Sequence, residues 1–279
     1  MPPSASIVVP TRDRPAYLEV TLGSLAAQAA AAGAEVLVVD DGSPELAAAT
    51  RALAERHGAR YLPNDRPGGL NVARNTGVAH AGAPLIVFLD DDVEADRNWL
   101  PGLLRAAAAE PSCEVFAGRI RVRLEGRPPR SCGREGPPIT FLDLGEQDRD
   151  AEFAWGANMA IRRAALARLG PFDPAIAGCG DEEEWQRRHK ALDGRVRYVA
   201  AAEVVHRRTA PDATLRALAR AAWRRGRASR AFDVRLGRAP SPARELRTLA
   251  GCLWHAARRR CPMALVLAAH SAGRLREVR

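Results

Sequence analysis

The sequence predicts an α/β fold, in which a sheet is wound with helices and is followed by a basic helical C-terminal extension. Two observations lead to this prediction. Short runs rich in β-branched residues alternate with amphipathic segments through the first half of the chain. The charge then divides: residues 1–206 hold 24 Lys and Arg against 29 Asp and Glu, a balance of −5, whereas residues 207–279 hold 18 against 4, a balance of +14.

The first half contains the clearest elements. Ser43 suits a helix N-cap, Pro44 suits the first helical position, and Glu45 in the first turn complements the helix dipole. A helix that begins there places Asp40 and Asp41 at the end of the preceding strand. Strands are expected at residues 6–10, 35–39, 59–62 and 85–89, and helices at residues 15–29, 44–57 and 70–80.

The second half is less regular. An Arg-, Gly- and Pro-rich stretch at residues 119–138 predicts a loop, and the first domain is expected to end near His206. The tail, residues 207–279, reads as helical, but its longest apolar run is far below the roughly 18 residues that cross a bilayer. The other elements expected are a helix after Trp99, strands at 114–117, 155–161, 196–199 and 203–205, and helices at 163–169 and 181–192.

The composition is typical of a globular protein. A chain of 279 residues with 47% hydrophobic side chains can bury a core. No charged segment followed by an apolar stretch opens the sequence, so a cytoplasmic protein is expected. The cysteines are scattered, odd in number and without paired-ligand spacing, which argues against a disulfide framework and against a zinc site. They are Cys113, Cys132, Cys179, Cys252 and Cys261.

Three acidic clusters lie at expected strand ends or at a helix start. They are Asp40 with Asp41, Asp90 to Asp92, and residues 181–184. In open α/β sheets the carboxyl ends of the strands meet at a ligand crevice. Carboxylate oxygens suit Mg²⁺ or Mn²⁺, which would bridge phosphate oxygens. The alternative is a turn with acidic caps, and the triple Asp alone does not decide between the two.

Several motifs, taken in their order, resemble those of the family 2 nucleotide-sugar glycosyltransferases, which have the GT-A fold. The resemblance runs from about residue 6 to residue 206, and Phe-Leu-Asp-Asp-Asp at 88–92 matches the DXD metal motif of that family. It implies an enzyme that transfers a sugar from a nucleotide diphosphate donor to an acceptor hydroxyl, with inversion and with Mn²⁺ or Mg²⁺. The nucleotide-donor half would be residues 1–110 and the acceptor half residues 111–206. The other matching segments are 7–15, 38–43, 69–77, 156–163, 170–173, 180–185 with Arg188, and 204–206.

The resemblance also implies roles for donor-side residues. Pro10 and Thr11 would line the nucleotide pocket, and Asp41 would contact the base with Asp40 beside it. Arg74 would lie near the base or the diphosphate.

The metal would be held at the DXD motif. Asp92 is the expected direct ligand, with Asp90 as the other matching acid, and Asp90 or Asp91 would contact the ribose or sugar of the donor. His206 matches a position that completes the metal site in some relatives. A histidine that only caps the end of a strand is the alternative for His206.

An acceptor hydroxyl must lose its proton as it attacks, which requires a base on the opposite face of the sugar. The family has Glu-Asp at this place, whereas this chain has Asp181-Glu182. Glu182 takes the position of the base if Arg188 aligns with the arginine of the family, and a shift of one residue would promote Asp181 or Glu183. Trp155 and Trp185 are candidates for stacking on a sugar and equally for the core.

Two other functions were compared with this one. A sugar-phosphate nucleotidylyltransferase needs a glycine-rich turn after its first strand, where this chain has Thr11-Arg-Asp-Arg14. A non-catalytic protein whose basic tail binds nucleic acid is favoured by charge alone, because aromatic residues make up only 5% of the chain. The tail either contacts an anionic membrane at its inner face or packs on the core. The acceptor stays open among a glycan, a lipid-linked molecule and a small molecule.

Overall fold

The computed structural model describes residues 2–64, 68–176 and 178–276, which form two compact units. The first unit consists of Met1–Arg121, Thr140–Ala175 and Asp181–His206. The second unit consists of Val122–Ile139, Ile176–Gly180 and Arg207–Arg279. Two segments from within the expected 1–206 domain therefore belong with the tail, and contacts inside the second unit explain this: Arg225 donates to the carbonyl of Pro138 at 2.7 Å.

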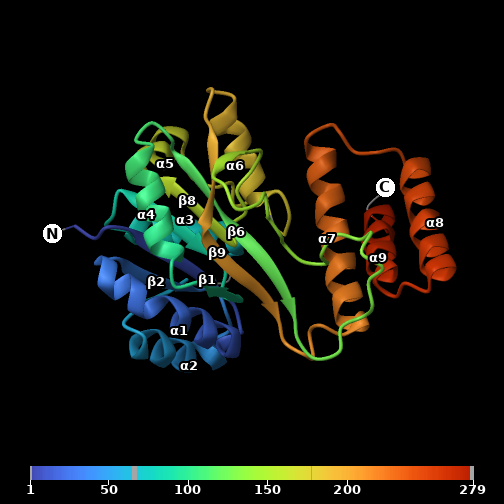
Figure 1. The fold of residues 1–279 in the computed structure, drawn as a ribbon, viewed down its shortest axis with the longest axis horizontal. Coiled ribbons are helices and arrows are strands. Elements are labelled where there is room, and N and C mark those ends of the chain that lie inside the picture. Colours follow the sequence, from blue (N-terminus) through green and yellow to red (C-terminus); the bar gives the residue numbers. More distant parts are fainter. Residues whose placement is uncertain (1, 65–67, 177, 277–279) are drawn as a thin grey trace. The chain divides into compact units, whose positions relative to one another are not determined.

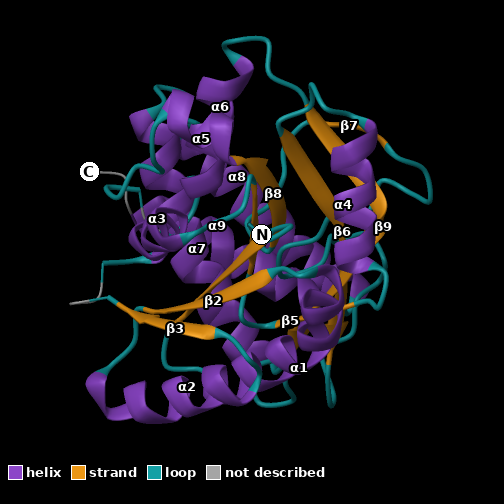
Figure 2. Cartoon of the chain, turned by 90° about the vertical axis from the view of Figure 1, so that its left-hand side faces the viewer, coloured by secondary structure: helices purple, strands orange, loops and turns teal. Residues whose placement is uncertain are grey.

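The described strands join one sheet in the order β3-β2-β1-β4-β8-β6-β9-β5, with β7 paired to β9 (Figures 1 and 2). The part from β3 to β4 is parallel, and β8 pairs antiparallel with β4. The carboxyl ends of β1, β2 and β4 therefore lie at one edge of the sheet. The strands are β1 (Ser6–Thr11), β2 (Glu35–Asp40), β3 (Arg60–Pro63), β4 (Leu85–Leu89), β5 (Val93–Ala95), β6 (Val115–Leu124), β7 (Arg149–Ala151), β8 (Asn158–Arg162) and β9 (Val196–Arg208).

Helices cover both faces of this sheet. Alternate residues of β1 point to opposite faces: Ile7 and Val9 pack with α1, α2 and α4, whereas Val8 packs with α3, α5 and α6. Figure 2 shows α1 and α2 on one side of β2 and β3, and α3 on the other. The helices are α1 (Pro15–Ala32), α2 (Pro44–Arg56), α3 (Leu70–His80), α4 (Trp99–Ala109), α5 (Arg163–Leu169) and α6 (Asp181–Lys190).

The strands β6 and β9 are longer than the sequence predicts, and the short strands β5 and β7 were not predicted. The expected loop at residues 119–138 begins as strand, because β6 continues to Leu124, and the two strands expected at 196–199 and 203–205 are one strand, β9. Paired neighbours on both sides of β9 outweigh the low strand propensity of Ala and Glu at residues 200–203. The arginines that suggested a loop pair across the strands instead: Arg121 lies 3.0 Å from Glu203.

The second unit is built around the tail helices α7 (Leu215–Arg235), α8 (Pro242–Arg259) and α9 (Met263–Arg276). Glycines allow α7 and α9 to pack closely: a Cβ on Gly226 would lie 2.0 Å from the carbonyl oxygen of His270. Arg274 ties the three helices together, since it lies 2.6 Å from Glu245 of α8 and 2.9 Å from Asp233 of α7. Of the helices described, none is both long and apolar enough to cross a bilayer.

Candidate active site

Asp91 and Asp92, which follow β4, are buried and bound by Thr11 at the end of β1 and by Arg14 just after it. Asp91 and Asp92 are 0% and 3% exposed. Thr11 donates its hydroxyl to Asp91 at 2.7 Å, and the Arg14 guanidinium donates to Asp92 at 2.8 Å and also to Asp91. The hydroxyl of Thr11 is engaged with this acidic group, and its predicted place in the nucleotide pocket stays a prediction. Arg14 was not predicted, because a single arginine in a basic-rich sequence carries no signal of its own.

Burial makes it costly to ionise this acidic group completely. Burial raises the pKa of Asp91 to about 7 against the opposing effect of Arg14. Burial and the neighbouring Asp92 also raise the pKa of Asp90. A bound cation would offset the repulsion that Arg14 leaves uncompensated, so the residues present fit a divalent metal ion.

Asp92 faces His206 across the edge of the sheet. The register of β5 and β9 places Val93 opposite His206, so Asp92 comes next to the histidine. His206 Nε2 lies 3.2 Å from Asp92 Oδ1, and both side chains are buried. His206 Nδ1 donates to the carbonyl of Thr140 at 2.9 Å, which fixes the ring and turns Nε2 toward the carboxylate. One carboxylate oxygen and one imidazole nitrogen are suitable ligands for Mn²⁺.

A second charged group joins α3 to the start of α6. Arg74 is 2% exposed, donates to the carboxylate of Asp181, and lies 3.7 Å from Glu182 Oε2. Glu182 Oε1 accepts a hydrogen bond from the backbone nitrogen of Gly156 at 3.1 Å. A Cβ on Gly156 would lie 1.8 Å from Arg74 Nη2, so only glycine allows this approach.

The two neighbouring acids of this group have opposite tendencies. Burial opposes ionisation of Asp181, but the Arg74 guanidinium outweighs it and lowers the pKa of Asp181. Burial and the adjacent Asp181 charge raise the pKa of Glu182 to about 8. Asp181 is therefore the permanent counter-ion of Arg74, while Glu182 can take up and release a proton near neutral pH.

The remaining acids of α6 form ion pairs within the helix. Glu183 and Glu184 pair with Arg187 at 2.6 Å and Arg188 at 2.9 Å, each one helical turn away. Arg188 also donates to the backbone carbonyl of Pro171 at 2.9 Å. Glu183 is thus engaged in an ion pair with Arg187, and its place as an alternative base stays a prediction.

Asp41 holds the segment that leads into α3. Its carboxylate accepts from the backbone nitrogens of Gly68 at 2.8 Å and Gly69 at 3.0 Å, and from the side chain of Asn64 at 2.8 Å. Asp41 therefore shapes this edge of the sheet through its own hydrogen bonds. Its predicted contact with the base stays a prediction.

The other residues predicted near the nucleotide lie beside it. Asp40 accepts from the backbone nitrogen of Gly42 and from the Tyr61 hydroxyl, both at 2.9 Å. Pro10 is buried within β1 and pairs in register with Val39 of β2. The predicted contacts of Asp40 and Pro10 with the nucleotide stay predictions.

The two tryptophans predicted as candidates for stacking on a sugar differ in burial. Trp185 is 0% exposed, lies 5.9 Å from the Phe172 ring between centroids, and donates to the carbonyl of Gly170. Stacking of a sugar on Trp185 is therefore ruled out by its burial in the core. Trp155 is half-buried, with its ring 6.4 Å from that of Phe153.

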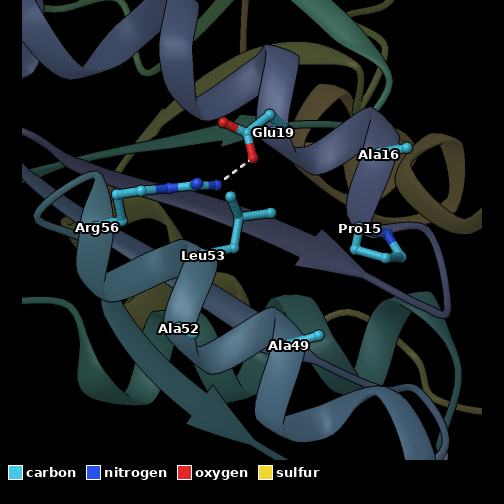
Figure 3. Close-up of a pocket in the computed structure, with 7 residues that line it drawn as sticks. All are labelled: Pro15, Ala16, Glu19, Ala49, Ala52, Leu53 and Arg56. Atoms are coloured by element: carbon cyan, nitrogen blue, oxygen red, sulfur yellow. Dashed lines mark hydrogen bonds and ion pairs between the residues drawn. The ribbon is translucent and has the colours of Figure 1, made fainter.

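A separate hollow lies between α1 and α2 (Figure 3). An ion pair between Glu19 and Arg56 joins the two helices across it. The described residues that line it include none of those predicted for donor, metal or base, so we assign it no part in the chemistry. They are Pro15, Ala16, Glu19, Ala49, Ala52, Leu53 and Arg56.

Two curated proteins to which this chain is similar are named glycosyltransferases. Validoxylamine A glucosyltransferase of Streptomyces hygroscopicus subsp. jinggangensis is 30% identical over 209 residues, which is 65% of this chain and 50% of that protein. Pre-mycofactocin glycosyltransferase of Mycobacterium tuberculosis is 29% identical over 207 residues, which is 72% of this chain and 42% of that protein. The chain thus spans half or less of the length of these relatives.

Solved structures share the fold. The mannosyltransferase PcManGT from Pyrobaculum calidifontis, in complex with GDP-Man and Mn²⁺, aligns with a TM-score of 0.60 at 17% identity over 100% of this chain and 71% of that one. GalNAc-T7 with UDP, GalNAc and Mn²⁺ aligns with a TM-score of 0.59 at 17% identity, over 79% of this chain and 47% of that one. The expected GT-A-like sheet flanked by helices is confirmed.

A family model described as glycosyl transferase family 2 matches residues 6–170. The match covers β1 to α5 and includes the acidic group after β4 and Arg74. Because it extends over more than half of the chain, the protein belongs to glycosyl transferase family 2.

Proposed function

We propose that this protein transfers a sugar from a nucleotide diphosphate donor to an acceptor hydroxyl, with inversion and with a divalent metal ion. The observation that carries the proposal is Glu182, a carboxyl only 12% exposed that accepts from the Gly156 backbone nitrogen, with a pKa raised to about 8 beside the ion pair of Arg74 and Asp181. The names of the relatives are those of glycosyltransferases, which supports the reaction class.

The first role falls to Glu182. In its ionised form it accepts the proton of the acceptor hydroxyl as the oxygen attacks the anomeric carbon, and a pKa near the working pH suits that transfer. Arg74 keeps Asp181 ionised beside it, and the Asp181 charge in turn strengthens Glu182 as a base. One base with one departing group corresponds to a single displacement, which inverts the anomeric centre.

The second role falls to the acidic group after β4. Asp92, Asp90 and His206 would hold Mn²⁺ or Mg²⁺, which when bound neutralises the charge that grows on the departing diphosphate. Thr11 and Arg14 fix the orientation of Asp91 and Asp92, so the carboxylates do not have to reorganise during the reaction. Thr11 and Arg14 engage both carboxylate oxygens of Asp91, whereas Arg14 engages only Oδ2 of Asp92 and the other oxygen faces His206, which makes Asp92 the better ligand.

The experiment that tests the reaction is a panel of UDP-, GDP- and dTDP-sugars, assayed for Mn²⁺-dependent release of nucleoside diphosphate. We expect one donor to be hydrolysed slowly and to raise the melting temperature only with the metal present. Asp92→Asn should lose both effects while its circular dichroism is unchanged. Failure of every donor in both assays, or full activity of Asp92→Asn at saturating Mn²⁺, would overturn the proposal.

We also propose that the tail contacts an anionic membrane surface, where an acceptor linked to lipid or to the cell envelope would be met. Helix α8 has an apolar face that is open to solvent: Leu246, Leu253 and Trp254 are 56%, 48% and 69% exposed and recur at intervals of seven and eight residues from Leu246. Residues 207–279 carry a balance of +14 (18 − 4), and each basic residue near anionic lipid contributes about 1 kcal/mol.

Flotation with anionic and neutral vesicles tests this contact on the full chain. The protein should float with the anionic vesicles and be released by high salt, and Trp254→Ala combined with Leu253→Ala should reduce flotation. Leu192→Ala is the matched control, since Leu192 is 60% exposed in the first unit. Equal flotation of the double variant and the control would show that the α8 face does not make the contact.

A further inference from the structure

A group of possible metal ligands lies in the second unit, apart from the residues assigned above. It consists of Cys132, Glu135, His255 and Cys261, whose ligand atoms all lie within 4.8 Å of one another. Glu135 Oε1 lies 2.6 Å from His255 Nε2, 3.1 Å from Cys261 Sγ and 3.2 Å from Cys132 Sγ. Cys132 Sγ also lies 3.2 Å from His255 Nε2. Two sulfurs, one nitrogen and one oxygen thus face a common centre.

Hydrogen bonding alone is a poor account of this arrangement. Three groups approach one carboxylate oxygen, which has two lone pairs to offer. None of the three groups contacts the other oxygen, Glu135 Oε2, because that oxygen already accepts from the Ser131 hydroxyl at 2.8 Å and from the Cys132 backbone nitrogen at 3.3 Å. These two bonds hold the carboxylate so that Oε1 points at the common centre, as hydrogen bonds to the far oxygen of a metal ligand do.

The backbone brings the four residues together from two places in the sequence. Helix α8 carries His255 and ends at Arg259. The next residue, Arg260, has a left-handed φ of 48°, which turns the chain and places Cys261 at the junction with α9. The Met263 backbone nitrogen donates to the carbonyl of Arg130 at 3.2 Å, which brings the segment of Cys132 and Glu135 to that junction. Cys261 is 2% exposed and the Glu135 side chain 3%.

We propose that these four side chains bind a Zn²⁺ ion that fastens the 122–139 segment to the tail helices. Thiolate sulfur and imidazole nitrogen are ligands that Zn²⁺ prefers, and a carboxylate oxygen completes a four-coordinate set. Both thiols lose their protons to solvent on binding, so the ion with Cys132, Cys261 and Glu135 as anions carries a net charge of −1. Four protein ligands leave no place for a substrate, which makes the site structural.

Metal analysis of the full-length protein, purified without a metal-affinity tag, tests the site. We expect about one zinc per chain, as for a structural site with tight binding. Cys132→Ser and Cys261→Ser should each lose most of it. Cys252→Ser is the matched control, because Cys252 lies on α8 outside the group, and it should keep its zinc.

If a cysteine variant does not fold, loading the wild-type protein with Co²⁺ tests the site without any substitution. The wild-type protein loaded with Co²⁺ should show the charge-transfer absorption of a thiolate-bound, four-coordinate ion. Asp92→Asn should keep its zinc, since Asp92 belongs to the first unit. Zinc below about one-tenth per chain together with no cobalt absorption, a disulfide between Cys132 and Cys261 in the mass spectrum, or loss of zinc from Asp92→Asn would each overturn the proposal.

Discussion

Asp181 and Glu182 are adjacent acids, but the pKa of Asp181 is lowered and that of Glu182 is raised. Glu182→Gln removes the proton acceptor and keeps the hydrogen-bonding shape, so donor binding should persist while transfer falls by about 10²- to 10⁴-fold. Steady-state kinetics with donor hydrolysis and transfer measured separately will show this. Glu183→Gln is the control and should stay near the wild-type rate, because Glu183 pairs with Arg187 on the helix surface.

The same residue gives the wild-type enzyme a characteristic dependence on pH. Since the base acts when ionised, kcat/KM should rise as pH increases toward and through about 8, the pKa of Glu182. A rate that is flat from about pH 5 upward would show that the base has an ordinary carboxyl pKa. A larger loss in Asp181→Asn, with Glu182→Gln still active, would move the base by one residue.

At the scale of helices and strands, the close packing of α7 on α9 depends on glycine. A Cβ on Gly226 meets a carbonyl oxygen of the facing helix, so Gly226→Ala should lower the free energy of unfolding by about 1–3 kcal/mol. Gly251 of α8 has nothing within 4 Å of its added Cβ. Gly251→Ala should instead stabilise the protein by up to about 1 kcal/mol, and equal effects of the two variants in urea unfolding would contradict this account.

The sequence predicts a helix or strand accurately where residues close to its ends mark where it begins or stops. The helices Leu70–His80 and Arg163–Leu169 and the strand Leu85–Leu89 match their predicted bounds. Each has a turn-forming residue beside one end, namely Gly69, Gly170 and Pro84. In β6 and β9 the decisive interactions join residues far apart in sequence, such as Arg121 and Glu203. No local pattern of residues reports such a pair.

The same limit applies to the sites. Asp90, Asp92 and Arg74 stood out because acids after a buried strand and ordered motifs are visible locally. Arg14 was missed because only the folded chain shows which acids it contacts. The spacing of the cysteines argued against zinc, whereas Cys132 and Cys261 meet Glu135 in space.

For the whole molecule, the raised pKa of Glu182 links the free energy of unfolding to pH. The folded state holds a proton on Glu182 up to about pH 8, whereas an unfolded glutamate releases it near its ordinary pKa of 4.5. The contribution of this proton is therefore complete below about pH 4.5 and is lost as pH rises through about 8. Glutamine cannot ionise, so Glu182→Gln should gain free energy of unfolding relative to the wild type between about pH 5 and about pH 9.

Urea unfolding of both proteins at several pH values measures that gain. The difference between variant and wild type cancels the contribution of His189, whose pKa is lowered by burial. A constant difference across the range would mean that Glu182 is already ionised in the folded protein at pH 5.

The division of the chain into two interleaved units also sets an order in time. The ribosome delivers Val122–Ile139 long before Arg207–Arg279, the stretch with which it forms the second unit. At about 5–20 residues per second, the interval before the tail is complete lasts from several seconds to about half a minute. During that interval the first unit can already be closing around β1 to β4, while Val122–Ile139 still waits for its partners. A message truncated before residue 207 would yield a protein with a nearly complete sheet and a 122–139 segment that lacks the rest of its unit.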